Sequence, residues 1–312
     1  MDQPTVTKRL HLVVVLYNSA EALPVFLRCL LAQTLTDWRL VAVDNASADG
    51  SATLIADLGD DRTLLLRNDR NLGFAVAANQ GLREAGANGA TDFVLINPDT
   101  MFEPDFLQFM LIRQQETNAA VLTPRIMRAD KPQKAWYAGG HFTRDWVFWN
   151  AHEPYDAAAD AGARPVEFAS GCCLLLCRDV LERVGLLDER FFVYWEDTDF
   201  CLRLAQQGIA ITYVADLVML HEGGASTGGE FSTGYSALYY RSYTQLLRQH
   251  FGMRAALATI MRLMKAAMLQ RPTPWRTMVR EAGAMLSGIV ATTPATKGLD
   301  AAPAKISETR PG

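Results

Sequence analysis

A chain of 312 residues, with 49% hydrophobic and 21% charged residues, has the composition of a globular protein and can form one large domain or two small ones. Its formal net charge of −4 gives no reason to expect a nucleic-acid partner. The five cysteines are an odd number without zinc-finger spacing, which suits a reducing compartment.

Apolar runs and amphipathic segments alternate through the first 116 residues. We expect strands at residues 10–16, 38–44, 63–66 and 93–96, and helices at residues 21–33, 51–58, 75–85 and 104–116. This alternation is typical of βαβ units and predicts an α/β fold, with helices on both faces of a mostly parallel sheet. Tyr17-Asn18-Ser19 follows the first strand, where a dinucleotide fingerprint would need glycines. Because a Walker loop is also missing, the sequence argues against an NAD enzyme or an ATPase.

Two of the predicted strands end at carboxylates. Asp44 closes the second strand, and Asp99 follows Asn97-Pro98, where proline stops the fourth. Ligands bind at the carboxyl edge of an open α/β sheet. Asp99 and Asn97 could therefore hold a hard divalent cation, and Asp44 could contact a base or a ribose. Both acids could instead stabilise turns, because Asn, Pro and Asp are turn formers.

Residues 131–164 lack a regular pattern and are rich in aromatic side chains. Trp136, Trp146 and Trp149 lie in this stretch, with Gly139-Gly140 between the first two. Aromatic rings in a loop can stack on a sugar or an acceptor, or they can cover a sheet edge, and the sequence leaves both interpretations open. A strand is expected at residues 167–177. Its Cys172, Cys173 and Cys177 are expected to be buried as small hydrophobic residues.

A cluster of acids follows a short helix at residues 179–185. Glu196, Asp197 and Asp199 come directly after the aromatic run 191–195, which has the character of a strand, and precede a helix expected at residues 199–207. Acids cap helix N-termini well. Capping does not comfortably account for three of them, so at least one is a candidate general base.

The last apolar strands are expected at residues 209–214 and 218–220. The second of them ends at His221, before Gly223-Gly224. A single histidine is usually structural, but this one ends an apolar run and could be a further metal ligand.

These motifs together resemble the family 2 inverting glycosyltransferases with the GT-A fold, and most closely the rhamnosyltransferase-like branch. The resemblance covers roughly residues 10–250. It rests on the order and spacing of seven motifs: VVVLYNS (13–19), VDNASADGS (43–51), NLGFA (71–75) with Asn79, NPD (97–99), SGCCLL (170–175), WEDTD (195–199) and His221.

The resemblance implies roles for residues in most of these motifs. Asp197 would be the catalytic base, with Glu196 beside it contacting substrate. Asp99 and His221 would hold Mg²⁺ or Mn²⁺, and Asn97 stands where the family's metal motif has its first acid. The donor and its nucleotide would be bound by Tyr17, Asn18, Asp44, Asn71, Gly73 and Asn79.

The implied reaction is the inverting transfer of a sugar from a nucleotide sugar to a glycan or lipid-linked acceptor in cell-surface polysaccharide synthesis. dTDP-L-rhamnose is the donor expected first, and a UDP-hexose or UDP-galactofuranose is the alternative. A catalytically silent nucleotide-sugar-binding scaffold is the alternative from another functional class.

The C-terminal part has a different character. Residues 241–280 contain eight Lys or Arg and no acid among many apolar residues, which predicts basic amphipathic helices. These could pack on the catalytic domain or lie on an anionic membrane surface. We expect a catalytic domain at 1–250, a basic helical segment at 251–290 and a disordered tail at 291–312. A signal peptide and a bilayer-spanning run of ~18 residues are not visible, so the expected location is cytoplasmic, peripheral on the inner face of the membrane.

Overall fold

The computed structural model describes residues 9–142, 148–150, 160–223, 233–270, 283, 285–287 and 307–309. Seven helices are defined within these residues: α1 (Leu23–Leu31), α2 (Ser51–Ala56), α3 (Phe74–Ala87), α4 (Phe106–Thr117), α5 (Arg178–Val184), α6 (Glu196–Gln206) and α7 (Thr233–Gln270). The strands of the first half are β1 (Leu10–Leu16), β2 (Trp38–Asp44), β3 (Thr63–Arg67), β4 (Asp92–Ile96), β5 (Thr100–Phe102) and β6 (Val121–Arg128). The later strands are β7 (Ala135–Tyr137), β8 (Gly140–Phe142), β9 (Phe148–Asn150), β10 (Ala163–Val166), β11 (Cys173–Cys177), β12 (Ile211–His221) and β13 (Ser307–Thr309).

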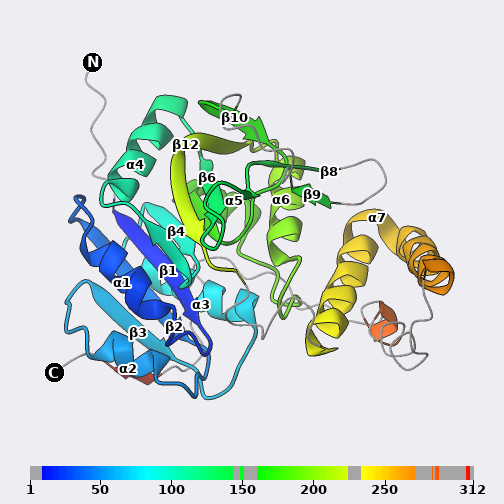
Figure 1. Cartoon of the computed structure of the whole chain (residues 1–312), viewed down its shortest axis with the longest axis horizontal. Coiled ribbons are helices and arrows are strands. Elements are labelled where there is room, and N and C mark those ends of the chain that lie inside the picture. Colours follow the sequence, from blue (N-terminus) through cyan, green and yellow to red (C-terminus); the bar gives the residue numbers. More distant parts are fainter. Residues whose placement is uncertain are drawn as a thin grey trace.

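One 11-stranded sheet forms the centre of the molecule (Figure 1). Its strands lie in the order β10-β12-β6-β11-β4-β1-β2-β3-β13, with β5 added to β12 and β7 to β6. The strands β4, β1, β2 and β3 are parallel, whereas β11 is antiparallel to β4 and β6. The register pairs Leu10 with Trp38 and Leu16 with Asp44. The ends of β1 and β2 therefore reach the same edge of the sheet.

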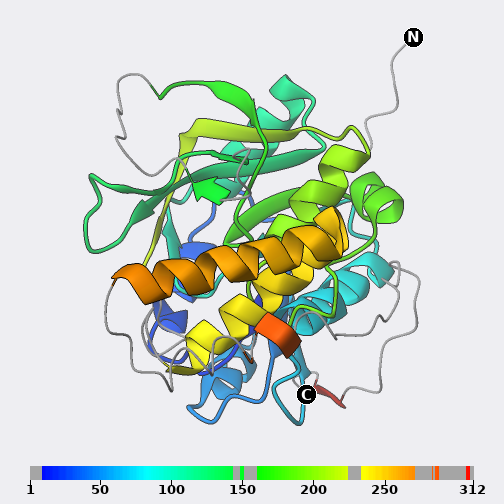
Figure 2. The same cartoon turned by 90° about the vertical axis from the view of Figure 1, so that its right-hand side faces the viewer.

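Helices cover both faces of the sheet. The helices α1 and α2 pack together on one face, and α3 packs on β1 and β2 from the other (Figure 1). The central strands are buried on both faces, which explains why β1 and β4 are almost entirely apolar. Figure 2 shows α7 lying across the layer that contains α3 and α6.

Helix α7 is broken once. Gly252 has φ 84° and ψ 169°, so the helix is two segments joined at a kink. The boundary expected at residue 250 lies next to this break and stays a prediction. None of the described helices is both long and apolar enough to cross a lipid bilayer. Apart from strand β13 and a few residues near 285, the chain after Gln270, including most of the expected tail, lies outside the described residues.

Several expectations about elements were wrong. The aromatic run 191–195 is not a strand, because Tyr194 and Trp195 adopt left-handed backbone angles. Helix α6 begins at Glu196, three residues earlier than expected. Within the expected strand 167–177 only Cys173–Cys177 is extended in the sheet, and the two expected strands before His221 are one strand, β12. The irregular middle contains short strands, and β6 before it was not anticipated.

Candidate active site

The predicted metal pair is brought together by strand pairing. His221 at the end of β12 pairs with Thr100, the residue after Asp99. Asp99 Oδ1 lies 3.1 Å from His221 Nε2, and both side chains are buried. Asp99 Oδ1 faces His221 Nε2, whereas His221 Nδ1 has no hydrogen-bond partner among the described residues. A buried carboxylate oxygen and a ring nitrogen at this separation fit two neighbouring ligands of one divalent cation.

The pair is only part of a coordination shell. In the described part of the chain, no group of three or more His, Cys, Asp or Glu side chains converges as metal ligands would. Asn97, the first residue of the NPD motif, is held through its backbone. Its N–H donates to the carbonyl of Cys172 at 2.9 Å, and its own carbonyl accepts the hydroxyl of Thr100 at 2.8 Å.

The carboxylate of Asp197 is held by backbone donors at the start of α6. Its Oδ2 accepts the N–H of Gly171 at 3.2 Å, and its Oδ1 accepts the N–H of Thr198 at 2.7 Å. The neighbouring Cys172 accepts the N–H of Asn97. The turn at Gly171-Cys172 therefore joins the candidate base to the loop that carries Asp99. Sequence reasoning quoted this turn but gave it no role, because the sequence does not show which residues its N–H groups will meet.

The two adjacent acids differ in their surroundings. Glu196 is buried, and within the described chain its Oε2 has no hydrogen-bond partner. Burial, with the neighbouring charge of Asp197 added, raises the pKa of Glu196 far above the usual glutamate range. Burial also raises the pKa of Asp197, but its bonds from Gly171 and Thr198 oppose that shift. Glu196 therefore keeps its proton more readily, and the negative charge of the pair rests on Asp197.

The third acid of the cluster, Asp199, is tied into a structural network. Its carboxylate is fully buried and accepts the Nε–H of Arg203 at 2.8 Å. Its other oxygen is 2.8 Å from Gln249 Nε2 and 2.7 Å from His250 Nε2. The neighbours of Asp199 thus hold α6 against α5 and α7 rather than leave its carboxylate open to a substrate.

The predicted nucleotide-binding residues of the first two strands meet in a pair of loops. Asn18 donates its N–H to the hydroxyl of Ser47 at 3.0 Å and accepts the N–H of Ala48 at 2.9 Å. Tyr17 is 37% exposed beside this contact. Asp44 is buried, and its closest described donor is the N–H of Ser47, at 3.4 Å from each carboxylate oxygen. These contacts fix the loop that follows Asp44.

A network of amides supports the same edge. Asn45 donates to Asn71 Oδ1 at 2.9 Å and accepts from Asn68 at 3.1 Å, and Asn68 in turn exchanges bonds with Gln80. Asn71 also accepts the N–H of Gly73 at 2.9 Å. Sequence reasoning missed Asn45, Asn68 and Gln80. The only signal was polar residues at the ends of β2 and β3, which turn formation explains equally well.

Asn79 and Gly73 make contacts within the protein. The side chain of Asn79 is buried. Its Nδ2 donates to the carbonyl of Leu187 at 2.8 Å and to Glu189, and its Oδ1 accepts the N–H of Leu187 at 3.0 Å. Its contact with a donor stays a prediction. Gly73 has φ +89°, and a Cβ there would lie 2.5 Å from the carbonyl oxygen of Phe192. Glycine at this position allows the start of α3 to approach the segment that leads to Glu196 and Asp197.

The aromatic stretch before β8 contributes one ring to the site. Trp136 packs edge-on against His221, with ring centroids 4.6 Å apart. Trp146 lies outside the described residues, and so does the side chain of Trp149. Cys172 and Cys173 are buried as expected, whereas Cys177 is only half-buried, and all five cysteines are free thiols.

Comparison with known proteins gives matches along most of the chain. A family model described as glycosyl transferase family 2 matches residues 11–185. An N-acetylglucosaminyl-diphospho-decaprenol L-rhamnosyltransferase of Mycobacterium tuberculosis strain H37Rv is 28% identical over 295 residues, covering 85% of this chain and 95% of that protein. The dTDP-rhamnosyl transferase RfbF of Shigella flexneri is 26% identical over 189 residues, covering 59% of this chain and 60% of that protein.

Solved structures share the fold. TarS 1–349 of S. aureus, in complex with UDP-GlcNAc, superposes with a TM-score of 0.59 at 14% identity, covering 90% of this chain and 81% of that one. The mannosyltransferase PcManGT of Pyrobaculum calidifontis, in complex with GDP-Man and Mn²⁺, gives a TM-score of 0.53 at 19% identity, covering 92% and 87%. The predicted GT-A architecture, a three-layer α/β sandwich around a mostly parallel sheet, is confirmed.

Proposed function

The chain belongs to glycosyl transferase family 2, and we propose that it transfers L-rhamnose from dTDP-L-rhamnose to a glycan or lipid-linked acceptor in cell-surface polysaccharide synthesis. The names of two relatives support this donor and this kind of acceptor. The main supporting observation is a pair of contacts at adjacent residues. The N–H of Gly171 bonds the Asp197 carboxylate, and the carbonyl of Cys172 accepts the N–H of Asn97, in the loop that carries Asp99 beside His221.

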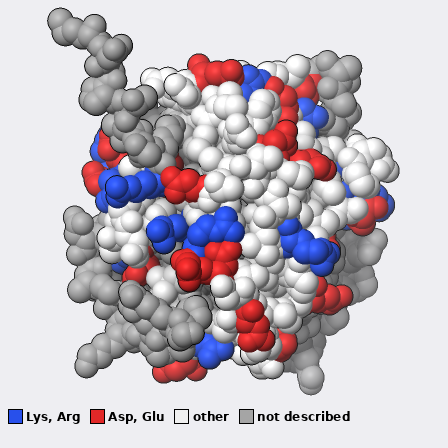
Figure 3. All heavy atoms as spheres, turned by 90° about the vertical axis from the view of Figure 1, so that its left-hand side faces the viewer, with Lys and Arg blue, Asp and Glu red and all other residues white. Residues whose placement is uncertain are grey.

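A UDP-hexose or UDP-galactofuranose donor is the second candidate. It is favoured by a hexosyltransferase, Agl10 of Haloferax volcanii, that is 25% identical over 213 residues, and by the UDP-GlcNAc complex of TarS. Nucleic acid is not among the proposed partners. The formal net charge is −4, and Figure 3 shows basic and acidic side chains interspersed on the face opposite α7.

Asp197 is the proposed general base. An acceptor hydroxyl gives its proton to the Asp197 carboxylate while its oxygen attacks the anomeric carbon of the donor sugar. The bond from that carbon to the diphosphate oxygen breaks on the opposite side, and the nucleoside diphosphate leaves. A single displacement inverts the configuration and needs no covalent glycosyl-enzyme. Glu196, which keeps its proton near neutral pH, adds no second negative charge beside the base.

Asp99 and His221 are the proposed ligands of Mg²⁺ or Mn²⁺. The buried approach of His221 Nε2 to within 3.1 Å of Asp99 Oδ1 supports this assignment, and Asn97 offers an amide oxygen from the same loop. Such an ion, when bound, offsets the negative charge of the leaving diphosphate. The complex of PcManGT with GDP-Man and Mn²⁺ is consistent with a divalent metal.

The nucleotide is proposed to lie at the carboxyl edge of β1 and β2. Asp44 is assigned to the base, and Tyr17, Asn18 and Asn71 to the rest of the nucleotide pocket. The bonds between the loops at Asn18 and Ser47 support a pocket that is formed before the donor arrives. Gly73 and Asn79 contribute by packing this region against the segment at residues 187–192.

A lipid-linked acceptor is best served by an enzyme at the membrane surface, and we place that contact on the second segment of α7, on the cytoplasmic side. Met253, Leu257 and Met261 are spaced by four residues and therefore share one helix face, where they are 44%, 44% and 68% exposed. The exposed Arg254 lies in the same segment. The basic residues from Arg262 onward lie outside the side chains that the structure describes.

Donor binding and turnover test the proposal together. A panel of dTDP- and UDP-sugars should raise the melting temperature only for the true donor, because a bound ligand stabilises the folded state by mass action. Slow release of nucleotide from that donor without acceptor would distinguish an enzyme from a silent scaffold. Chelation with EDTA should abolish release, and Mn²⁺ or Mg²⁺ should restore it. A protein that binds none of these sugars, or that hydrolyses none, would contradict the proposal.

A further inference from the structure

The segment just before the two acids has an unusual backbone. Tyr194 and Trp195 have φ values of 67° and 71°, in the left-handed region that bulky side chains rarely adopt. Such a conformation is costly for a residue with a bulky side chain and persists only where the surroundings hold it. Trp195 directly precedes Glu196 and Asp197. The contacts that hold Trp195 therefore also fix the course of the chain at these two acids.

Helix α7 holds this segment on its upstream side. The Ser242 hydroxyl donates to the carbonyl of Val193 at 3.0 Å. The ring of Tyr243 stacks on Trp195 with centroids 4.6 Å apart, and Tyr239 lies 5.1 Å from the same ring. The left-handed turn is therefore packed against residues 239–243 of one helix.

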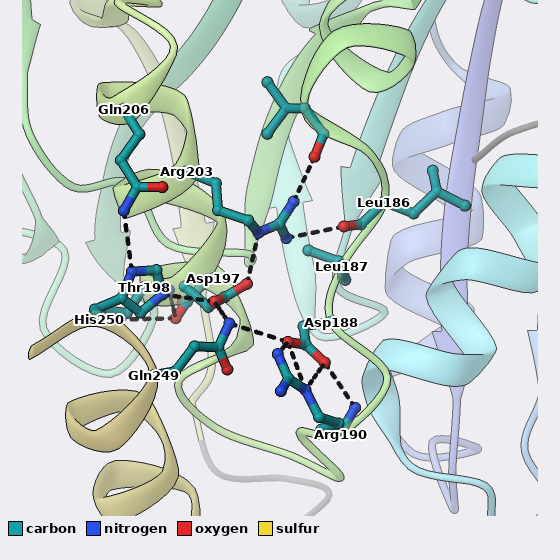
Figure 4. A network of polar contacts seen from close by, with 12 residues as sticks. Leu186, Leu187, Asp188, Arg190, Asp197, Thr198, Arg203, Gln206, Gln249 and His250 are labelled. Carbon is teal, nitrogen blue, oxygen red and sulfur yellow. Dashed lines mark hydrogen bonds and ion pairs between the residues drawn. The ribbon is translucent and has the colours of Figure 1, made fainter. Parts of the chain in front are cut away.

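The same helix holds the acids on their downstream side. Gln249 and His250 both reach the buried Asp199 carboxylate, at 2.8 and 2.7 Å. Gln249 also lies 3.2 Å from Asp188, and His250 Nδ1 is 3.3 Å from Gln206 (Figure 4). Contacts from α7 thus fix residues 193, 195 and 199, which bracket Glu196 and Asp197.

We propose that α7 is a positioning element of the active site, in which Ser242, Gln249 and His250 set the place of the Asp197 carboxylate by clamping the turn on both sides. The inference rests on the proposed function, in which Asp197 is the base. Both α6 and α7 lie beyond residues 11–185, which the family model matches. A displacement of about 1 Å at a reacting group can lower a rate ~10²-fold. Loosening the clamp should therefore lower the rate without weakening donor binding.

His250→Ala is the main test, in the full-length protein. We expect kcat for dTDP release to fall roughly 10- to 100-fold, while the Kd for dTDP from calorimetry stays within about threefold, because the described hydrogen bonds that fix the nucleotide loops run between those loops. His250→Gln, whose Nε2 can replace the lost donor, should restore most of kcat. Arg241→Ala, at an exposed position on the first segment of the same helix, is the matched control and should behave as wild type.

Two further variants keep the test decisive. If His250→Ala does not fold, Ser242→Ala removes one hydroxyl next to Val193, and the same pattern of lower kcat at unchanged Kd is expected. A kcat within twofold of wild type in folded His250→Ala or Ser242→Ala, even with a lower melting temperature, would overturn the positioning role. Asp197→Asn separates the two claims. If Asp197→Asn is inactive while His250→Ala and Ser242→Ala are fully active, only this inference fails. If Asp197→Asn is active, the proposed function fails.

Discussion

Two neighbouring carboxyl groups in this protein have different tasks because their surroundings differ. Asp197 accepts two backbone N–H groups, whereas Glu196 is buried with an unpartnered oxygen among the described residues. The first arrangement favours a charged carboxylate and the second a neutral one. The catalytic assignment therefore depends on contacts rather than on the order of the acids in the sequence.

The raised pKa of Glu196 predicts a pH dependence of stability. Its pKa is higher in the folded state than the ~4.3 of an unfolded glutamate, so the folded state keeps the proton longer. This stability is fully present below the unfolded pKa and is lost as the pH rises through the folded pKa. The melting temperature of wild type should therefore fall relative to that of Glu196→Gln between pH 5 and pH 9. Each kcal/mol of lost stability corresponds to a fall of roughly 2–4 °C.

Thermal melts of both proteins at the two pH values measure this difference. Glu196→Gln keeps Asp197 and every backbone contact, so it isolates the glutamate. Melting temperatures that change in parallel with pH would mean that Glu196 titrates as an ordinary exposed acid.

The sequence identified both acids but could not tell which one is charged. Their residue types and their place after an aromatic run are local information. Burial and the N–H groups of Gly171 and Thr198 are set by the fold, and the Gly171 contact joins residues 26 positions apart. Asp99 and His221 were predicted as a pair only through a resemblance, because their contact depends on the pairing of β5 with β12.

At the scale of elements, the close approach of α3 to the segment before α6 depends on one glycine. Gly73 combines φ +89° with a position where a Cβ would lie 2.5 Å from Phe192 O, whereas Gly59 has φ +60° and open space around it. Gly59→Ala should cost only the left-handed backbone strain, about 1–2 kcal/mol. Gly73→Ala should cost on the order of 1–3 kcal/mol more, because Phe192 must shift and because φ 89° with ψ 162° is a region that only glycine readily adopts.

Urea denaturation of the two variants gives the comparison directly. Gly73→Ala should also lower dTDP release, since Phe192 lies four residues before Glu196, while Gly59→Ala should leave it unchanged. Equal losses of stability in the two variants would contradict the extra cost expected at residue 73.

Elements governed by local pattern were predicted well, and those governed by contacts were not. The strands β1 to β4 and the helices between them follow from alternating apolar runs, with ends within two residues of those expected. The run 191–195 has the residues of a strand, yet its left-handed turn is packed against α7, which lies far away in sequence. Strand β6 contains Pro124, which usually argues against a central strand.

For the whole molecule, the proposed membrane contact predicts binding that depends on charge and on the face of α7. The protein should co-sediment with vesicles of anionic lipid at low salt and dissociate at high salt, because salt screens exposed charges. A triple variant with Met253, Leu257 and Met261 changed to Gln should lose most of this binding, since these side chains supply the exposed apolar face.

The triple variant should keep an intact nucleotide-binding core. Its Kd for dTDP, measured by calorimetry, should therefore equal that of wild type, which is the control for this experiment. Wild-type protein that ignores anionic vesicles at low salt would remove the membrane contact from the account, and with it the assigned location.

The central claim is that Asp197 is the base of a glycosyl transfer, and its most direct test is dTDP release from dTDP-L-rhamnose by wild type and Asp197→Asn, with dTDP affinity measured alongside. The asparagine keeps the shape of the side chain and removes its basicity. The account predicts a fall in rate of roughly 10²–10⁴ with the Kd for dTDP within a few fold of wild type. Near-wild-type turnover by Asp197→Asn would contradict it and leave Glu196 or Asp199 as the base.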